Sequence, residues 1–220
     1  TGTTAARIIR GLGRAPVGWQ EAIRSGAFHG GADAGGLVQL WIADRDRFDA
    51  DKMKALAPAE YHSMIDRAGA LFALSTKDPA RIGAAGVATI VSSSDPLYLD
   101  RRPLEPSADP AQEAARQRLG NAGYEPMPTT SVLDWRPEAQ DDIAAPGVRV
   151  AGVEAALWCE SVENFDDAAL LLLPRLALIA QQAWGPALRD DVLSAVRAHD
   201  EVWTRLGFGA HFRSSEIYGS

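Results

Sequence analysis

Four short apolar runs recur along the chain, and each leads into an aromatic residue. They are Ala-Pro-Val-Gly-Trp19, Leu-Val-Gln-Leu-Trp41, Thr-Ile-Val-Ser-Ser-Ser-Asp-Pro-Leu-Tyr98 and Val-Glu-Ala-Ala-Leu-Trp158. A continuous run of Val, Ile, Leu and Ala is typical of a strand that is buried on both faces of a parallel sheet. The pattern predicts strands over residues 17–19, 37–41, 87–91 and 148–157.

Between these runs the apolar residues follow helical spacing. The predicted helices cover residues 3–12, 58–72, 78–85, 111–119, 166–183 and 186–205, with a short helical turn at 21–25. Pro174 is expected to kink the helix over 166–183, because its ring removes one backbone hydrogen bond. Strands that alternate with helices predict an α/β fold with a parallel sheet.

The number of strands limits the architecture. A complete (βα)8 barrel has eight strands and about 250 residues, whereas this chain has 220 residues and four credible strands. The sequence therefore predicts a TIM-barrel-like C-terminal half-barrel of about four βα units, within a single domain over residues 1–220.

Composition excludes some partners and structures. The net charge is −7 and no run of Lys or Arg stands out, which argues against nucleic acid and anionic membranes as partners. No apolar stretch is long enough to span a bilayer. The single cysteine, Cys159, excludes an intrachain disulfide and does not indicate a compartment.

Aromatic residues and carboxylates near strand ends favour a sugar as ligand. The carboxyl ends of parallel barrel strands gather around one pocket. Sugar C–H groups pack on aromatic rings, and sugar hydroxyls need hydrogen-bond acceptors. The pattern therefore predicts a sugar site at this edge of the sheet.

Five motifs occur in an order that indicates a family. They are Gly18-Trp19-Gln20-Glu21, Val38-Gln39-Leu40-Trp41, Tyr98-Leu99-Asp100, Asp134-Trp135-Arg136-Pro137 and Leu157-Trp158-Cys159-Glu160, followed by Pro174-Arg175 and Ala183-Trp184. From about Arg14 to Trp184 the chain resembles the C-terminal half of the glycoside hydrolase family 20 barrel, the exo-acting β-N-acetylhexosaminidases. The segment 43–77 after Trp41 is longer than is usual there.

The resemblance implies a substrate-assisted reaction, in which the acetamido oxygen of the substrate attacks the anomeric carbon. It implies that Trp19, Trp41 and Trp158 form a box around the acetamido group and the sugar face. Tyr98 is the implied catalytic residue, which donates its hydroxyl to the acetamido oxygen.

The same resemblance assigns the contacts to the ring hydroxyls. Asp100 and Glu160 are expected to accept hydrogen bonds from the hydroxyls at positions 4 and 6, and Trp135 to contribute an indole N–H near position 6. The implied substrate is a glycoside of N-acetylglucosamine or N-acetylgalactosamine. No metal and no other cofactor is implied.

The general acid of the family is missing from the expected place. In the family an Asp-Glu pair ends the fourth barrel strand, in a His-x-Gly-Gly-Asp-Glu type motif before the Gly-Trp-x-Glu strand. We find no such motif before Gly18-Trp19. The sequence therefore predicts a fragment that lacks the catalytic Asp-Glu pair and is inactive alone.

A half-barrel is also expected to self-associate, because its two edge strands and its inner face lack partners. The inner-face residues that we expect to be partly exposed are Leu37, Val38, Leu40, Val87, Ile90, Val153 and Leu157.

Other interpretations stay open at this point. One is a non-catalytic sugar-binding or assembly module that kept the aromatic walls. Another is a different barrel enzyme, for which Tyr98 and Trp158 are expected to lie far apart. Trp184 and Trp203 lie on predicted helices, so we assign both to packing. Glu21 either orients the loop of Trp19 or begins the following helix.

Overall fold

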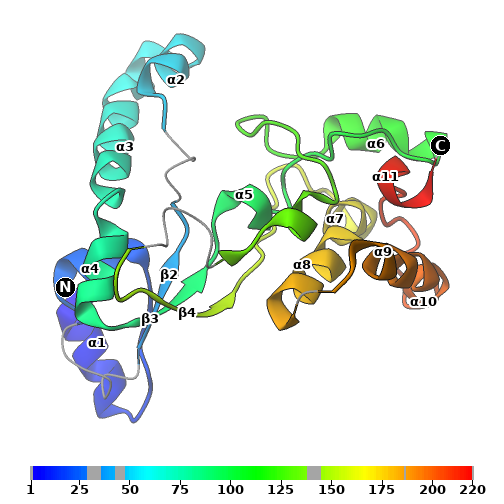
Figure 1. Ribbon diagram of the computed structural model, residues 1–220. Helices are drawn as coiled ribbons and strands as arrows, with labels where there is room; N and C mark the ends of the chain where they lie inside the picture. Colours follow the sequence, from blue (N-terminus) through cyan, green and yellow to red (C-terminus); the bar gives the residue numbers. More distant parts are fainter. Residues whose placement is uncertain (1, 29–35, 43–47, 138–144, 186, 220) are drawn as a thin grey trace. The chain divides into compact units, whose positions relative to one another are not determined.

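The computed structural model describes residues 2–28, 36–42, 48–137, 145–185 and 187–219 (Figure 1). The chain divides into two compact units. The first unit comprises residues 1–95 and 137–153, and the second comprises 96–136 and 154–220. The expected single domain over residues 1–220 stays a prediction.

A four-stranded parallel sheet forms the centre of the first unit (Figure 1). Its strands lie in the order β1 (Val17–Trp19), β2 (Leu37–Leu40), β3 (Ala88–Val91) and β4 (Arg149–Val153), and each pair of neighbours is parallel. The predicted α/β class and the four predicted strands are confirmed. The prediction for β4 was too long, because the strand ends at Val153.

The side chains on the two faces of the sheet differ in how deeply they are buried. Val38 and Leu40 on β2, with Val91 on β3, are fully buried. Their neighbours Leu37 and Ile90 are only half-buried. Successive residues of a strand point to opposite faces, so one face is covered and the other is partly open.

This alternation corrects the expected exposure of the inner face. Val38, Leu40 and Val87 are buried rather than partly exposed. Leu37, Ile90, Val153 and Leu157 are half-buried, as expected.

The first unit also contains six helical segments among the described residues. They are α1 (Gly2–Gly11), η1 (Gln20–Ser25), α2 (Ala50–Leu56), η3 (Ala59–Tyr61), α3 (His62–Ser75) and α4 (Asp78–Ala85). The sequence pattern did not predict α2, which Asp49 caps by accepting a hydrogen bond from the backbone N–H of Lys52 at 2.9 Å. An ion pair between Lys54 and Asp66 links α2 to α3, so the segment after β2 carries a packed helix pair.

The second unit is mainly helical. Its elements are η4 (Pro110–Gln112), α6 (Glu113–Arg118), η5 (Ser131–Asp134), α7 (Phe165–Leu172), α8 (Arg175–Trp184), α9 (Arg189–Ala198), α10 (Asp200–Arg205) and α11 (Ser215–Tyr218), and α5 (Ser94–Leu97) stands where the chain enters it. The buried residues Leu119, Leu170, Leu171 and Phe212 form a core cluster. An ion pair between Arg118 and Asp167 joins the end of α6 to the start of α7.

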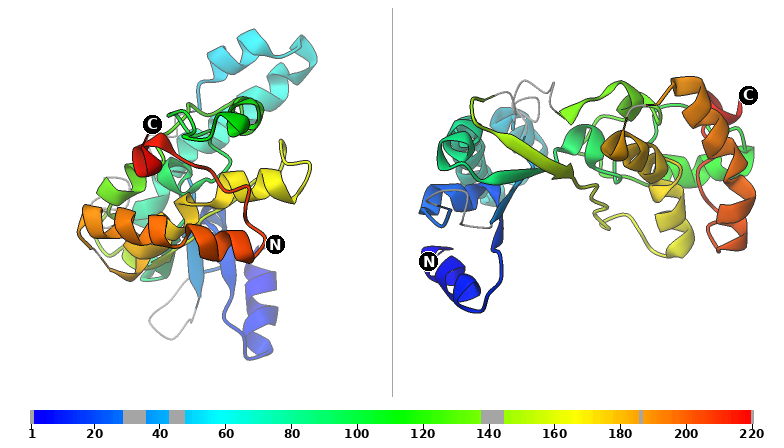
Figure 2. Two further views of the ribbon diagram at one scale, coloured as in Figure 1. Left: turned by 90° about the vertical axis from the view of Figure 1, so that its right-hand side faces the viewer. Right: turned by 60° about the horizontal axis from the view of Figure 1, so that its bottom comes forward.

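Two predicted long helices are each divided in the structure, as the yellow to orange part of Figure 2 shows. The predicted helix over 166–183 is interrupted between Leu172 and Arg175, where Pro174 stands. Pro174 has no N–H to donate and its ring crowds the preceding turn, so the helix ends there instead of bending. The predicted helix over 186–205 is α9 and α10, separated at His199. Among the described helices, none has the length and apolar character that crossing a membrane requires.

The open edges of the sheet generate a prediction about association. The strand order leaves β1 and β4 at the edges, and Val17 on β1 is exposed. Unpaired edge strands recruit further strands, and an inserted lysine blocks such pairing. We expect the purified chain to exceed its monomer mass of 23.5 kDa in light scattering, and Val17→Lys to shift it toward the monomer. A clean monomer at high concentration would contradict this expectation.

Candidate functional site

An aromatic group lies at the carboxyl ends of β1 and β2 in the first unit. The rings of Trp19 and Trp41 meet edge to face, with centroids 5.9 Å apart. Phe72 of α3 also meets Trp41 edge to face, with centroids 5.7 Å apart, and stacks on Phe48 with centroids 5.0 Å apart. The parallel pairing of β1 and β2 produces this group, because it brings both strand ends to the same edge. The segment after β2 thus adds aromatic residues beside Trp41 that the sequence analysis did not assign.

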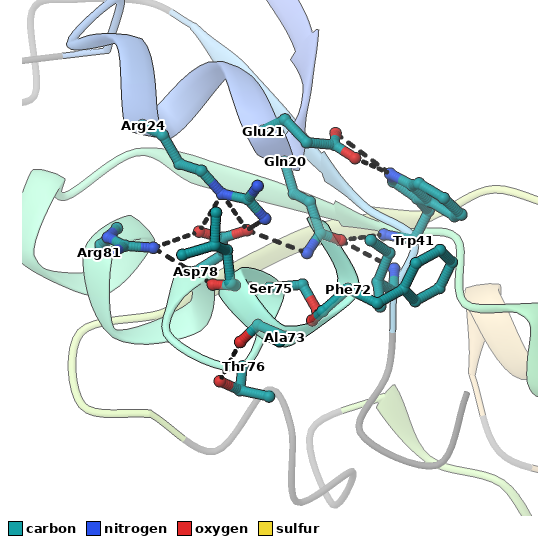
Figure 3. Close-up of polar contacts among 12 residues, drawn as sticks. Gln20, Glu21, Arg24, Trp41, Phe72, Ala73, Ser75, Thr76, Asp78 and Arg81 are labelled. Atoms are coloured by element: carbon teal, nitrogen blue, oxygen red, sulfur yellow. Dashed lines mark hydrogen bonds and ion pairs between the residues drawn. The ribbon is translucent and has the colours of Figure 1, made fainter. Parts of the chain in front are cut away.

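Glu21 has a clear partner in the structure. The indole N–H of Trp41 donates to both carboxylate oxygens of Glu21, at 3.2 and 3.3 Å (Figure 3). Of the two roles considered for Glu21, orienting the Trp19 loop or beginning the next helix, the second is observed, since Glu21 lies in the first turn of η1. Its contact with Trp41 was not predicted.

A second aromatic group lies in the second unit and contains Tyr98 and Trp158. Their rings meet edge to face with centroids 5.7 Å apart, and Tyr124 meets Tyr98 at 6.0 Å. Backbone pairing holds this arrangement, because Leu99 N–H donates to Ala156 C=O at 2.7 Å. A different barrel enzyme was expected to separate Tyr98 from Trp158, so the structure does not favour that alternative.

Asp100 follows this pairing and is a buried carboxylate. Its side chain is 1% exposed, and neither carboxylate oxygen has a hydrogen-bond partner in another described residue. Burial raises the pKa of Asp100 to about 6, and the negative charge of Glu160 adds to the rise. A buried carboxylate without donors is costly, and the hydroxyls of a ligand are donors that would relieve that cost.

Arg175 fixes the segment that carries Tyr98 and Asp100. Its buried guanidinium donates to the carbonyls of Leu99, Arg101 (2.7 Å) and Leu171 (2.8 Å). Burial lowers the pKa of Arg175 to about 10, so the group keeps its charge at neutral pH. This structural role of Arg175 was not predicted from the sequence, where Pro174-Arg175 was only part of the family motif.

Trp135 and Glu160 occupy different surroundings. Trp135 is buried and directly follows η5. The side-chain amide of Gln182 on α8 donates to the carbonyls of Val132 (3.2 Å) and Leu133, so α8 holds the loop that presents Trp135. Glu160 is exposed and interacts electrostatically with Asp100.

The assignment of Trp184 and Trp203 to packing was correct for only one of the two. Trp203 is buried, which confirms its assignment to packing. Trp184 is 92% exposed at the end of α8, so its assignment to packing was wrong for the described chain. Helical spacing indicates that a residue lies on a helix, but it does not show whether another element covers that position.

The chain does contain one Asp-Glu dipeptide, which the sequence analysis overlooked. Asp200-Glu201 lies in the first turn of α10, not at a strand end. Asp200 accepts a hydrogen bond from His211 at 2.8 Å and forms an ion pair with Arg213. These partners indicate a structural role. No group of three or more His, Cys, Asp and Glu side chains that could hold a metal ion is found among the described residues.

Of the seven predicted site residues, Trp19 and Trp41 lie in the first unit and the other five, Trp135 included, lie in the second. Trp19 and Trp41 contact each other in the first unit. In the second unit Tyr98 contacts Trp158, and Asp100 interacts electrostatically with Glu160. That the two groups meet around one ligand stays a prediction.

Comparisons with known proteins agree with these features. Residues 73–187 match the model of the family described as "Glycosyl hydrolase family 20, catalytic domain". A β-N-acetylhexosaminidase of Cellulomonas fimi is 28% identical over 213 residues, which cover 94% of this chain and 33% of that protein. The chain therefore spans about a third of the length of that relative.

Solved structures show the same fold. The family 20 β-N-acetylhexosaminidase of Streptomyces coelicolor A3(2) matches with a TM-score of 0.62 and 24% identity, over 96% of this chain and 35% of that one. The N-acetyl-β-hexosaminidase of Streptomyces plicatus, solved with Thio-NAglucal, matches with a TM-score of 0.64 and 24% identity, over 98% of this chain and 35% of that one. A mutant form of that enzyme was solved with its product GlcNAc.

The fold is part of a TIM-barrel-like α/β domain, with aromatic residues at the ends of its first two strands. The chain belongs to glycosyl hydrolase family 20. The predicted fold, a C-terminal part of a TIM-barrel-like domain of about four βα units, is confirmed.

The raised pKa of Asp100 predicts a pH-dependent stability difference. Between its unfolded pKa of 3.8 and its folded pKa of about 6, the folded state binds more protons than the unfolded state, so the Asp100 contribution to stability falls as pH rises. The neutral variant Asp100→Asn should therefore gain stability relative to wild type between pH 4 and pH 7, by up to about 3 kcal/mol. Denaturant unfolding at both pH values measures the change.

The exposed variant Glu125→Gln serves as the control, because it makes the same chemical change outside the site. The change of this stability difference with pH should be larger for Asp100→Asn than for Glu125→Gln. If it is no larger, the free-energy cost of burying the Asp100 carboxylate is absent.

Proposed function

We propose that the chain supplies the C-terminal half of the sugar site of an exo-β-N-acetylhexosaminidase. The enzyme would release terminal N-acetylglucosamine or N-acetylgalactosamine by substrate-assisted retaining catalysis. The observation that carries the proposal is Asp100, a buried carboxylate without donors, two residues after Tyr98 in the aromatic pair Tyr98–Trp158. The family and its β-N-acetylhexosaminidase relatives support the same activity.

The aromatic residues would bind the acetamido group and the sugar face. Trp19, Trp41 and Trp158 form the walls of the acetamido-binding pocket, since indole rings bury C–H groups of a sugar over a large area. Tyr98 is the proposed catalytic residue and donates its hydroxyl to the acetamido oxygen as that oxygen attacks the anomeric carbon. A hydrogen bond that aligns the nucleophile in this way strengthens as charge develops.

The polar residues would form hydrogen bonds with the ring hydroxyls. Asp100 accepts a hydrogen bond from a hydroxyl at position 4 or 6, which provides the donor that its buried oxygens lack in the described chain. Glu160, which is exposed and electrostatically coupled to Asp100, accepts from the other. Trp135, held by the Gln182 contacts to its loop, offers its indole N–H near position 6.

The chain alone is proposed to be inactive. Its one Asp-Glu pair, Asp200-Glu201, belongs to α10 and has structural partners. A positioned general acid contributes about 10²- to 10⁴-fold to such a reaction. The alternative, a sugar-binding or assembly module without catalysis, shares the walls and differs only in whether a complete barrel with an acid exists.

The roles of Tyr98 and Glu160 can be separated kinetically in a complete catalytic domain that contains this chain. Tyr98→Phe should lower kcat more than it raises KM, because its hydrogen bond is strongest in the transition state. Glu160→Gln should act mainly on kcat/KM, because it weakens recognition of the ring hydroxyls. Steady-state kinetics with an aryl β-N-acetylglucosaminide measures both.

Equal and small effects of the two variants would show that these roles are assigned wrongly. Turnover by the purified 220-residue chain, abolished by Tyr98→Phe, would show instead that an acid is present within it.

A further inference from the structure

We propose that Gln20 and Glu21 are positioning residues for Trp41. These adjacent residues begin η1 directly after β1 (Figure 3). Gln20 holds the backbone of Trp41, and Glu21 holds its indole ring. The consequence for sugar binding rests on the proposed function, whereas the contacts themselves do not.

The buried amide of Gln20 continues the pairing of β1 with β2 beyond the last strand residue. Its side-chain oxygen accepts from the backbone N–H groups of Trp41 at 2.9 Å and Ile42 at 2.8 Å. Gln20 is 0% exposed. Buried N–H groups without acceptors are costly, so this single oxygen determines where the chain leaves β2.

A second contact fixes which way the Gln20 amide faces. Its NH₂ group donates to Asp78, the first residue of α4, at 3.3 Å. Asp78 is also 0% exposed and accepts from Arg24 at 2.9 Å and Arg81 at 2.8 Å. Because Asp78 can only accept and the N–H groups of Trp41 and Ile42 can only donate, only an amide satisfies both sides.

A glutamate at position 20 would lack the donor for Asp78 and would bring two carboxylates together. In the network from Arg24 and Arg81 through Asp78 and Gln20 to Trp41, each donor therefore meets an acceptor. It anchors the backbone after β2 to α4.

Glu21 provides the polar contact that sets the rotation of the Trp41 ring. The ring meets Trp19 and Phe72, both edge to face. Such contacts leave some freedom of rotation, whereas the indole N–H has one direction. Its hydrogen bond to the Glu21 carboxylate, at 3.2 and 3.3 Å, is charge-assisted and therefore stronger than a neutral one.

This geometry gives Glu21 an effect on the proposed sugar wall without contact to the sugar. If Trp41 is a wall of the acetamido box, a rotated indole would offer a different surface to the ligand. Glu21→Gln keeps an acceptor of nearly the same shape, while Glu21→Ala removes it. The two variants therefore separate positioning from the charge of the carboxylate.

The direct test is the indole N–H region of the ¹H–¹⁵N spectrum of the full chain, which has six tryptophans. Trp41→Phe identifies the Trp41 signal. Glu21→Ala should move this signal strongly and speed its exchange with solvent, and Glu21→Gln should move it less. Glu125→Gln, an exposed control, should leave all signals in place. A Trp41 signal unchanged by Glu21→Ala would overturn the positioning role.

A titration with N-acetylglucosamine of a complete catalytic domain that contains this chain tests the consequence separately. Glu21→Ala should weaken binding about threefold to tenfold, the loss of roughly one hydrogen bond, and Glu21→Gln should restore most of it. If Glu21→Ala moves the Trp41 signal but binds the sugar as wild type does, the link to the sugar wall is wrong. If the Trp41 signal moves and no variant or wild type binds, the proposed function fails while the positioning role stands.

Discussion

The parallel direction of the strands is the constraint on which the rest of the structure depends. Because β1 and β2 run the same way, Trp19 pairs with Gln39, and the residues after β1 reach the residues after β2. Gln20 and Glu21 therefore meet Trp41. In the second unit the parallel bridge between Tyr98 and Ala156 has the same effect, because it places Tyr98 against Trp158.

The buried charged side chains differ in how many hydrogen-bond partners they have among the described residues. Asp78 is satisfied by two guanidinium groups and an amide, and Arg175 by three carbonyls. Removing one partner from such a set is costly, since a buried charge is left alone. Asp100 differs, because its two oxygens have no donor in another described residue and its pKa is raised to about 6. This lack of donors is the observation on which the proposed binding role of Asp100 rests.

The sequence predicted the elements whose cause is local and missed those whose cause is tertiary. The strand over Val17–Trp19 and the helix over Asp78–Ala85 were predicted with the observed bounds, because apolar runs and caps are local signals. Pro174 was located, but whether a proline bends or ends a helix depends on its surroundings. The amide of Gln20 and the exposed ring of Trp184 had no local signal at all. Motif order supplied the family, and it placed Tyr98 with Trp158 before their contact was known.

The central claim is that Trp19 and Trp41 of the first unit and Tyr98 and Trp158 of the second surround one sugar. The acetamido methyl of N-acetylglucosamine is a suitable probe, because it would touch indole rings from both groups. Intermolecular NOEs from this methyl group to protons of the chain measure that directly. The account predicts NOEs to Trp41 and to Trp158 in the same complex. NOEs to only one group, or to neither, would contradict it.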